Sequence, residues 1–179
     1  MATGRSCRRS TSAPCGSPRP PATGPARPGQ AQALSDLATA YWWLGRFDQA
    51  AACNQRSLQL RRVLGDRRGE SLALGNLSQD YYALGRLHDA LACQQQSLAI
   101  IRELGDRPAE ARALNGLGGV SEGLGRFDEA LAWYEQALAL FTQVGDLAGQ
   151  GTVLANLTEA AFRAGRPAEC IGRALDVLG

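Results

Sequence analysis

The sequence predicts an all-α protein, a right-handed α-solenoid built from helix-turn-helix repeats. Short phrases return at a step of 40 residues, and the apolar residues between them recur at helical spacing. One helix pair cannot bury its own apolar face, so we expect neighbouring pairs to stack. The first phrase occurs as Leu44-Gly45-Arg46, Leu84-Gly85-Arg86, Leu124-Gly125-Arg126 and Ala164-Gly165-Arg166. The second occurs as Leu64-Gly65-Asp66, Leu104-Gly105-Asp106 and Val144-Gly145-Asp146.

The first segment, residues 1–30, differs from the rest of the chain. It holds five of the 19 basic residues, all arginines, six of the eight prolines and no acid. Such a stretch buries too little apolar surface to offset the entropy of ordering, so we expect a disordered Arg/Pro-rich tail. A basic arm that touches nucleic acid or anionic lipid is the alternative interpretation of this charge.

Residues 31–179 are predicted to form the array, in units of about 31–66, 67–106, 107–146 and 147–179, the last one incomplete. In the second unit Leu74, Leu77 and Tyr81 fall on one face, and Gly85 ends the first helix. The second helix is expected over about 87–103. Because the array begins in mid-phrase and stops inside a helix, we interpret the chain as a fragment of a longer array.

The turns and the helix contacts use residues with defined roles. A carboxylate at Asp66, Asp106 or Asp146 can cap the helix that follows it, because its oxygens accept backbone N–H bonds. Glycine after the last helical turn adopts the left-handed conformation at little cost. Small residues recur in one column, and we expect the two helices of a unit to touch closely there. That column comprises Ala50, Ala90, Ala130 and Cys170.

The repeat resembles the tetratricopeptide repeat, whose two helices carry a Leu–small–Tyr and an Ala–aromatic–Ala pattern around a turn glycine. The third unit carries this resemblance best, through Leu117, Gly118, Gly125, Ala130, Tyr134, Ala137 and Leu138. The period is 40 residues, whereas about 34 is typical. This longer type resembles the C-terminal arrays of STAND-type ATPases and antibiotic regulatory proteins of high-GC bacteria.

In such arrays the first helices of the units line a concave groove, so the resemblance implies a partner-binding surface here. The implied groove residues are Trp42, Trp43, Gln79, Tyr82, Arg112, Asn115, Glu122, Glu159, Phe162 and Arg163. Aromatic anchors beside amides and a few charges suit a peptide or a helix. The alternative is that the aromatic residues, Trp42 and Trp43 above all, pack between units.

Composition removes several functional classes. The chain has no Lys and a single His, which excludes a P-loop lysine, a Schiff base and the Lys-based carboxylate clamp known in this fold. His88, expected in a turn, has no partner spaced for zinc, and the five cysteines form no Cys-x-x-Cys pair. Gly116 to Gly119 lie inside a helical pattern and form no phosphate loop, but they are expected to loosen that helix. We therefore predict no enzyme, no cofactor and no metal site.

The sequence thus predicts a non-catalytic protein–protein interaction scaffold that binds a peptide or helix. The alternative is a sensor or regulatory fragment of a larger transcriptional or STAND-type ATPase regulator. We expect no contact of the repeats with nucleic acid, no membrane span and a cytoplasmic location. Uncovered apolar ends of the array would favour end-to-end self-association.

Overall fold

The structure is a computed structural model and describes residues 28–166. Within this range the chain forms seven α-helices and no strand. In chain order they are α1 (Pro28–Trp43), α2 (Phe47–Leu64), α3 (Arg67–Ala83), α4 (Leu87–Leu104), α5 (Arg107–Gly123), α6 (Phe127–Val144) and α7 (Leu147–Arg163).

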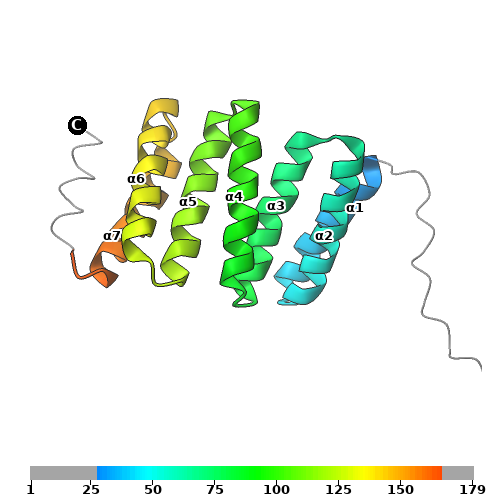
Figure 1. Cartoon of the computed structure of the whole chain (residues 1–179), viewed down its shortest axis with the longest axis horizontal. Helices are drawn as coiled ribbons and strands as arrows, with labels where there is room; N and C mark the ends of the chain where they lie inside the picture. Colours follow the sequence, from blue (N-terminus) through cyan, green and yellow to red (C-terminus); the bar gives the residue numbers. More distant parts are fainter. Residues whose placement is uncertain (1–27, 167–179) are drawn as a thin grey trace, which may run out of the picture.

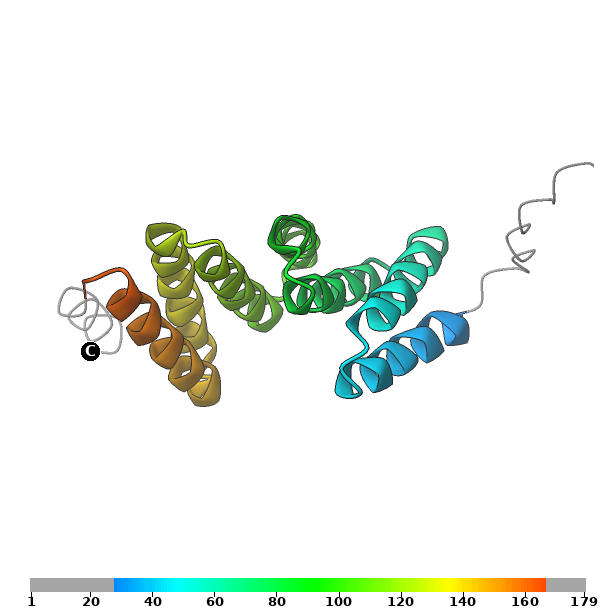
Figure 2. The same cartoon turned by 90° about the horizontal axis from the view of Figure 1, so that it is seen from below.

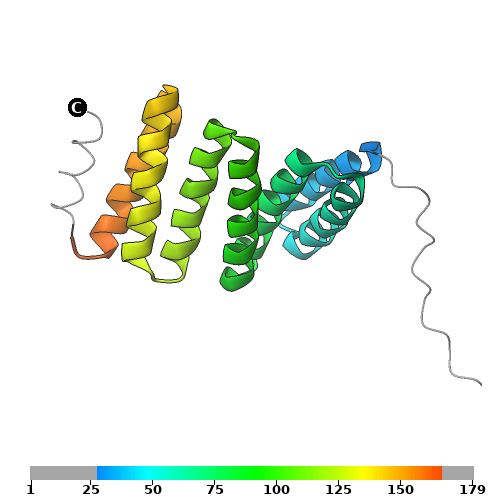
Figure 3. The same cartoon turned by 45° about the horizontal axis from the view of Figure 1, so that its top comes forward.

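The helices stand side by side in chain order (Figure 1). Each packs against the next one along the chain, and α5 also contacts α7. Figure 2 shows that the array bends, with α4 on the outer side of the bend, and Figure 3 shows the same order from an intermediate angle. The protein is an α-solenoid of helix-turn-helix units, as the repeated sequence predicts.

The predicted turn residues act as expected. The glycine of each repeated phrase has a positive φ, between 68° and 74°, throughout the described range. These residues are Gly45, Gly65, Gly85, Gly105, Gly125, Gly145 and Gly165. An L side chain rarely adopts this conformation, which closes a helix by returning backbone N–H groups to its last carbonyls. The capping carboxylates are confirmed too: Asp66 accepts from the N–H of Gly69 at 2.9 Å, and Asp146 does the same from Gly149.

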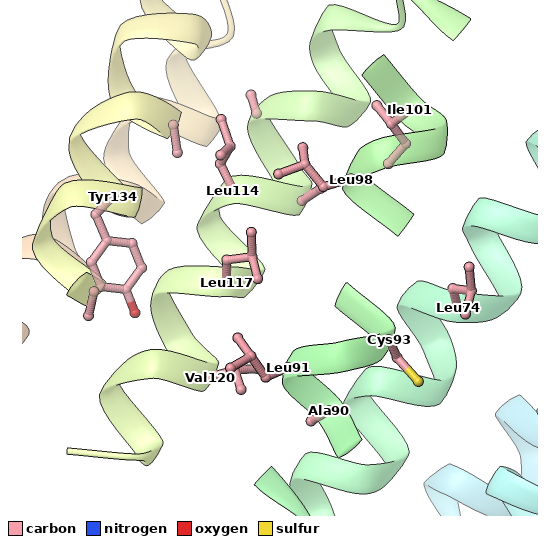
Figure 4. Close-up of a cluster of buried hydrophobic side chains, with 14 of the residues drawn as sticks. Leu74, Ala90, Leu91, Cys93, Leu98, Ile101, Leu114, Leu117, Val120 and Tyr134 are labelled. Atoms are coloured by element: carbon pink, nitrogen blue, oxygen red, sulfur yellow. The ribbon is translucent and has the colours of Figure 1, made fainter. Parts of the chain in front are cut away.

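One cluster of buried side chains runs from α2 to α7, and Figure 4 shows its middle part, from Leu74 of α3 to Tyr134 of α6. The expected apolar face of α3 is buried, with Leu74 and Leu77 1% and 3% exposed. The small column is confirmed for its described members, since Ala50, Ala90 and Ala130 are fully buried. In the second unit the hydroxyl of Ser78 donates to the carbonyl of Ala90 at 2.9 Å, so α3 and α4 approach each other closely at this point.

Ion pairs recur at the same 40-residue step. Glu70, in the first turn of α3, accepts from Arg62 of α2 at 2.8 Å and from Arg67 at 2.9 Å. Glu110 is held in the same way by Arg102 and Arg107. Burial would raise the pKa of Glu70, but the hydrogen bonds from the two arginines outweigh burial and lower it. These pairs join the end of one unit to the start of the next.

The N-terminal end differs from the expectation in two respects. Helix α1 begins at Pro28, three residues before the predicted start of the array, because proline is compatible with a first helical turn. Leu37, which shares a column with the buried Leu77, Leu117 and Leu157, is 44% exposed. The disorder expected for residues 1–27 and the place expected for Cys170 in the column of small residues lie outside the described residues.

Candidate partner-binding groove

A cavity of about 850 Å³ lies between α3 and α5, and we call it the central cavity. Buried residues of α4, including Gln94, Ser97 and Ile101, form its floor. Trp42 of α1, Phe141 of α6 and the first turns of α7 also contribute to the lining, the last as far as Thr152. Its size falls in the range of sites that hold a small molecule or a short peptide segment.

Helix α3 lines the cavity with a stripe of side chains that helical spacing dictates. Arg68, Leu72, Asn76 and Gln79 follow one another at intervals of three or four residues and so share one face of the helix. The opposite face carries the core leucines already described. An α3 anchored in the core therefore presents this polar and apolar stripe to the cavity.

Helix α5 supplies the facing wall, and two of its glycines permit close packing. A Cβ at Gly116 would lie 2.5 Å from Nε2 of Gln94, and one at Gly118 would lie 2.4 Å from Cε1 of Tyr134. Because Gly116 has no side chain, Gln94 can cross the floor of the cavity and donate to the carbonyl of Ala113 at 3.0 Å. The sequence alone suggested only that these glycines loosen the helix, whereas the structure shows that they admit neighbouring side chains.

The charged groups of the cavity are unequally paired. Arg68 donates to Asp106 at 2.6 Å, and Asp106 also accepts from the N–H of Ala109 at 3.1 Å. The backbone hydrogen bond first, and the Arg68 guanidinium second, hold the pKa of Asp106 below its usual range. Arg112 is exposed and forms no ion pair with any residue from 28 to 166. It therefore offers a guanidinium to whatever enters the cavity.

The amide side chains provide further hydrogen-bonding groups. Asn76 is half-buried and Gln79 exposed, and neither side chain is hydrogen-bonded to the described part of the chain. Asn115 accepts from Asn156 of α7 at 3.0 Å through its Oδ1, which leaves its own amide hydrogens available. Donors and acceptors of this kind can satisfy the backbone groups of a bound segment.

Five of the ten residues predicted for the groove line the central cavity: Trp42, Gln79, Tyr82, Arg112 and Asn115. Tyr82 is 46% exposed, and its ring lies against the backbone of Gly123. Trp42 packs edge-on against Phe47, with ring centroids 5.9 Å apart, so it both lines the cavity and packs within its own unit. This ring contact lies within the first unit, so it is not the packing between units that the alternative expects.

The other five predicted residues do not line the cavity: Trp43, Glu122, Glu159, Phe162 and Arg163. Glu122 accepts from the hydroxyl of Tyr134 at 3.1 Å and from Arg163 at 2.5 Å, so its carboxylate is already engaged. Trp43 and Phe162 are 78% and 75% exposed on other surfaces. The prediction extended the groove along the whole of each first helix, but the cavity ends within the early turns of α7.

The sequence reasoning missed several lining residues, among them Arg68, Leu72, Asn76, Leu104 and Asp106. A signal for one set was present, because Leu72 and Asn76 precede the predicted Gln79 by seven and three residues on the same helical face. No comparable signal exists for Leu104, which reaches the cavity from the end of α4. Its place depends on how α4 packs between α3 and α5.

The remaining chemistry-bearing residues form no additional site in the described part of the chain. His88 is an exposed residue in the first turn of α4 and does not lie in a turn between helices as predicted. Cys53 and Cys93 are free thiols, and burial raises the pKa of each. Between residues 28 and 166, His, Cys, Asp and Glu form no group of three or more placed to hold a metal ion. No described helix has the length and apolar character needed to cross a bilayer.

Consecutive helix pairs, closed by glycine turns and joined around one core, define the class of α-helical repeat proteins. The tetratricopeptide repeat family model matches residues 29–103, 70–143 and 109–171. The chain therefore belongs to the tetratricopeptide repeat family, as the resemblance of the third unit indicated.

Solved structures show the same fold at low sequence identity. BtubC (BKLC) from P. vanneervenii is 22% identical with a TM-score of 0.72, and the match covers 82% of this chain and 62% of BtubC. The STAND protein of Pyrococcus horikoshii, which has a tetratricopeptide repeat sensor, is 18% identical with a TM-score of 0.72, and the match covers 88% of this chain and 25% of that protein.

A third structure is the N-terminal domain of stress-induced protein-1 from C. elegans, which is 17% identical with a TM-score of 0.56. That match covers 70% of this chain and 93% of the domain. None of the curated proteins matches the sequence. At these identities the structural likeness concerns the fold alone.

Proposed function

We propose that the chain is a non-catalytic module that binds a peptide or a helix of a partner protein in the central cavity. The observation that carries the proposal is the lining: exposed apolar surface at Tyr82, Leu72 and Leu104 adjoins the unpaired groups of Gln79 and Arg112. Apolar side chains of a partner gain from burial against such residues, while polar side chains fix its orientation.

The family supports this proposal, because tetratricopeptide repeats are protein-interaction modules in general. It also supports a protein as the partner. The cytoplasmic location expected from the sequence stays a prediction. The absence of catalytic activity is proposed from the make-up of the cavity, where no nucleophile is paired with a base.

A selection from a random peptide library against the full chain tests the proposal. We expect selected peptides to bind at least about tenfold more weakly to Tyr82→Ala than to the parent, because the ring contributes apolar contact area. Phe162→Ala is the matched control, since Phe162 is an exposed aromatic residue that does not line the cavity. The proposal fails if no peptide is enriched, or if both variants bind like the parent.

A second proposal places the array as the sensor arm of a larger STAND-type regulator. It is favoured by one observation, the match to a STAND protein whose repeats are a sensor and of which this chain spans 25%. The adjoining genomic sequence tests it. A nucleotide-binding domain encoded in frame with the repeats would support the proposal, and unrelated genes on both sides would count against it.

A further inference from the structure

One face of α1 is more exposed than the corresponding face of α3, although two of its four residues, Leu34 and Tyr41, are half-buried. We call Leu34, Leu37, Tyr41 and Leu44 the α1 outer face. Leu37 and Leu44 are 44% and 68% exposed. The residues 40 positions later are Leu74, Leu77, Tyr81 and Leu84; the first three are 1%, 3% and 7% exposed, and Leu84 is half-buried. Helix α2 packs against α3, and its Gln55 donates to the hydroxyl of Tyr81 on this face.

The buried counterparts show what kind of element covers this face. In each internal junction the second helix of one unit lies antiparallel across the first helix of the next. Asn54 of α2 donates to Asp80 near the end of α3, whereas Arg62 of α2 pairs with Glu70 near its start. Arg102 of α4 pairs with Glu110 of α5 in the same register. The α1 outer face therefore fits a helix of the same type as α2, α4 and α6.

The chain itself carries one more sequence of that type. Residues 167–179 follow Ala164-Gly165-Arg166, the phrase that precedes α2, α4 and α6 in their own units. They also keep the columns of those helices, with Cys170 in the column of Ala50 and Leu178 in the column of Leu58. Residues 1–27 are a poorer match, because they contain five prolines and no apolar run.

We propose that the α1 outer face binds residues 167–179 of a second copy of this chain, so that arrays join head to tail. We apply the antiparallel register of the internal junctions to this contact by shifting residue numbers in steps of 40. In that register Leu178 would pair with Leu34, and Ala174 with Leu37. Where α2 and α3 place the polar pair Asn54 and Asp80, this junction has Ala174 and Ala40. It is therefore more apolar than the internal junction that it imitates.

The geometry of this contact decides the form of the assembly. The two surfaces are different and α1 and α7 lie at opposite ends of the array (Figure 1), so the contact is heterologous. Such a contact leaves one free face of each kind after every addition. We expect a concentration-dependent series of oligomers that extends beyond the dimer. This proposal is independent of what the central cavity binds.

Sedimentation velocity of the full chain over about a hundredfold range of concentration tests the proposal. We expect the parent chain to associate, and both Leu37→Glu and Ala174→Glu to weaken association by about tenfold or more, since each variant buries an unpaired charge. Val63→Glu is the matched control, because Val63 is an aliphatic residue of α2 that is 77% exposed. Circular dichroism establishes that each variant keeps its helix content.

Mixing the two variants is the decisive experiment. Leu37→Glu retains an intact 167–179 segment and Ala174→Glu retains an intact α1 outer face, so the mixture should form a one-to-one complex that grows no further. If Ala174→Glu loses helix content, a labelled peptide of residues 164–179 replaces it and should bind the parent chain but not Leu37→Glu. The proposal is wrong if the parent stays monomeric, if only Leu37→Glu affects association, or if the mixture, or the peptide in its place, does not bind.

Discussion

At the scale of single residues, the least expected feature is a buried carboxyl group in α3. Asp80 is 1% exposed and accepts from Nδ2 of Asn54 at 2.7 Å. The amide oxygen of the same asparagine, Oδ1 of Asn54, is buried and has no hydrogen-bond partner in the described structure. Burial raises the pKa of Asp80 more than the hydrogen bond from Asn54 lowers it. A protonated Asp80 would donate to that unsatisfied oxygen.

We therefore predict that Asp80→Asn raises the free energy of unfolding at neutral pH by about 1 kcal/mol, because an amide is uncharged and can donate to Asn54. Since the folded-state pKa of Asp80 is raised, its favourable protonated form is fully populated below the unfolded-state pKa and is lost as pH rises through the folded-state pKa. Urea denaturation from acidic to neutral pH should show the parent losing stability relative to the variant. A variant that is less stable than the parent at neutral pH would contradict this account.

A second residue-scale prediction concerns Gly118 in α5. Alanine usually stabilises a helix interior relative to glycine by about 1 kcal/mol. At Gly118 the added methyl group would overlap the ring of Tyr134, which is 1% exposed and held by Glu122. We expect Gly118→Ala to lower the free energy of unfolding by about 1–3 kcal/mol.

Gly151→Ala in α7 is the control for this prediction, because the added methyl group would meet no side chain and no other helix within 4 Å among residues 28–166. It should raise stability by about 0.5–1 kcal/mol. Thermal denaturation of both variants measures the contrast. Equal shifts of the same sign would mean that Tyr134 does not restrict the backbone of α5.

At the scale of helices, the contact of α3 with α4 depends on one small residue. Ala90 is fully buried and its carbonyl accepts from Ser78. Ala90→Trp should overpack this contact and lower the free energy of unfolding by about 1–3 kcal/mol or more. Ala92→Trp, two residues further along the same helix but exposed, should change it by less than about 0.5 kcal/mol. If the two variants melt alike in circular dichroism, the assigned helix pairing is wrong.

The helices and their ends could be predicted from the sequence because their signals are local. A glycine with positive φ and an aspartate three residues before a free backbone N–H act within one turn, as Gly85 and Asp106 show. The central cavity depends on packing between helices, which local sequence signals do not encode. Only five of the ten residues predicted for the groove therefore line it. Leu104 is a lining residue that was not predicted, because it enters the cavity from α4. Phe162 was predicted from its column but is exposed outside the cavity.

At the scale of the whole molecule, the array has no single centre, because each helix packs mainly on its neighbours in the chain. The effect of a substitution should therefore depend on its place along the solenoid. Leu37 and Leu117 occupy the same column in the first and third units, but they are 44% and 0% exposed. The pair separates the contribution of the residue type from that of its neighbours.

We expect Leu117→Ala to lower the free energy of unfolding by about 2–5 kcal/mol, since it leaves a cavity among α4, α5 and α6. Leu37→Ala, measured at low protein concentration, should lower it by less than about 1 kcal/mol. Hydrogen exchange should show the damage of Leu117→Ala in α4 to α6, while α1 and α2 keep their protection, because stability in a solenoid passes from neighbour to neighbour. Uniform loss of protection would instead mean that the array unfolds as one cooperative unit. In that case the ion pairs of Glu70 and Glu110, added to the apolar contacts, would couple neighbouring units strongly enough to unfold together.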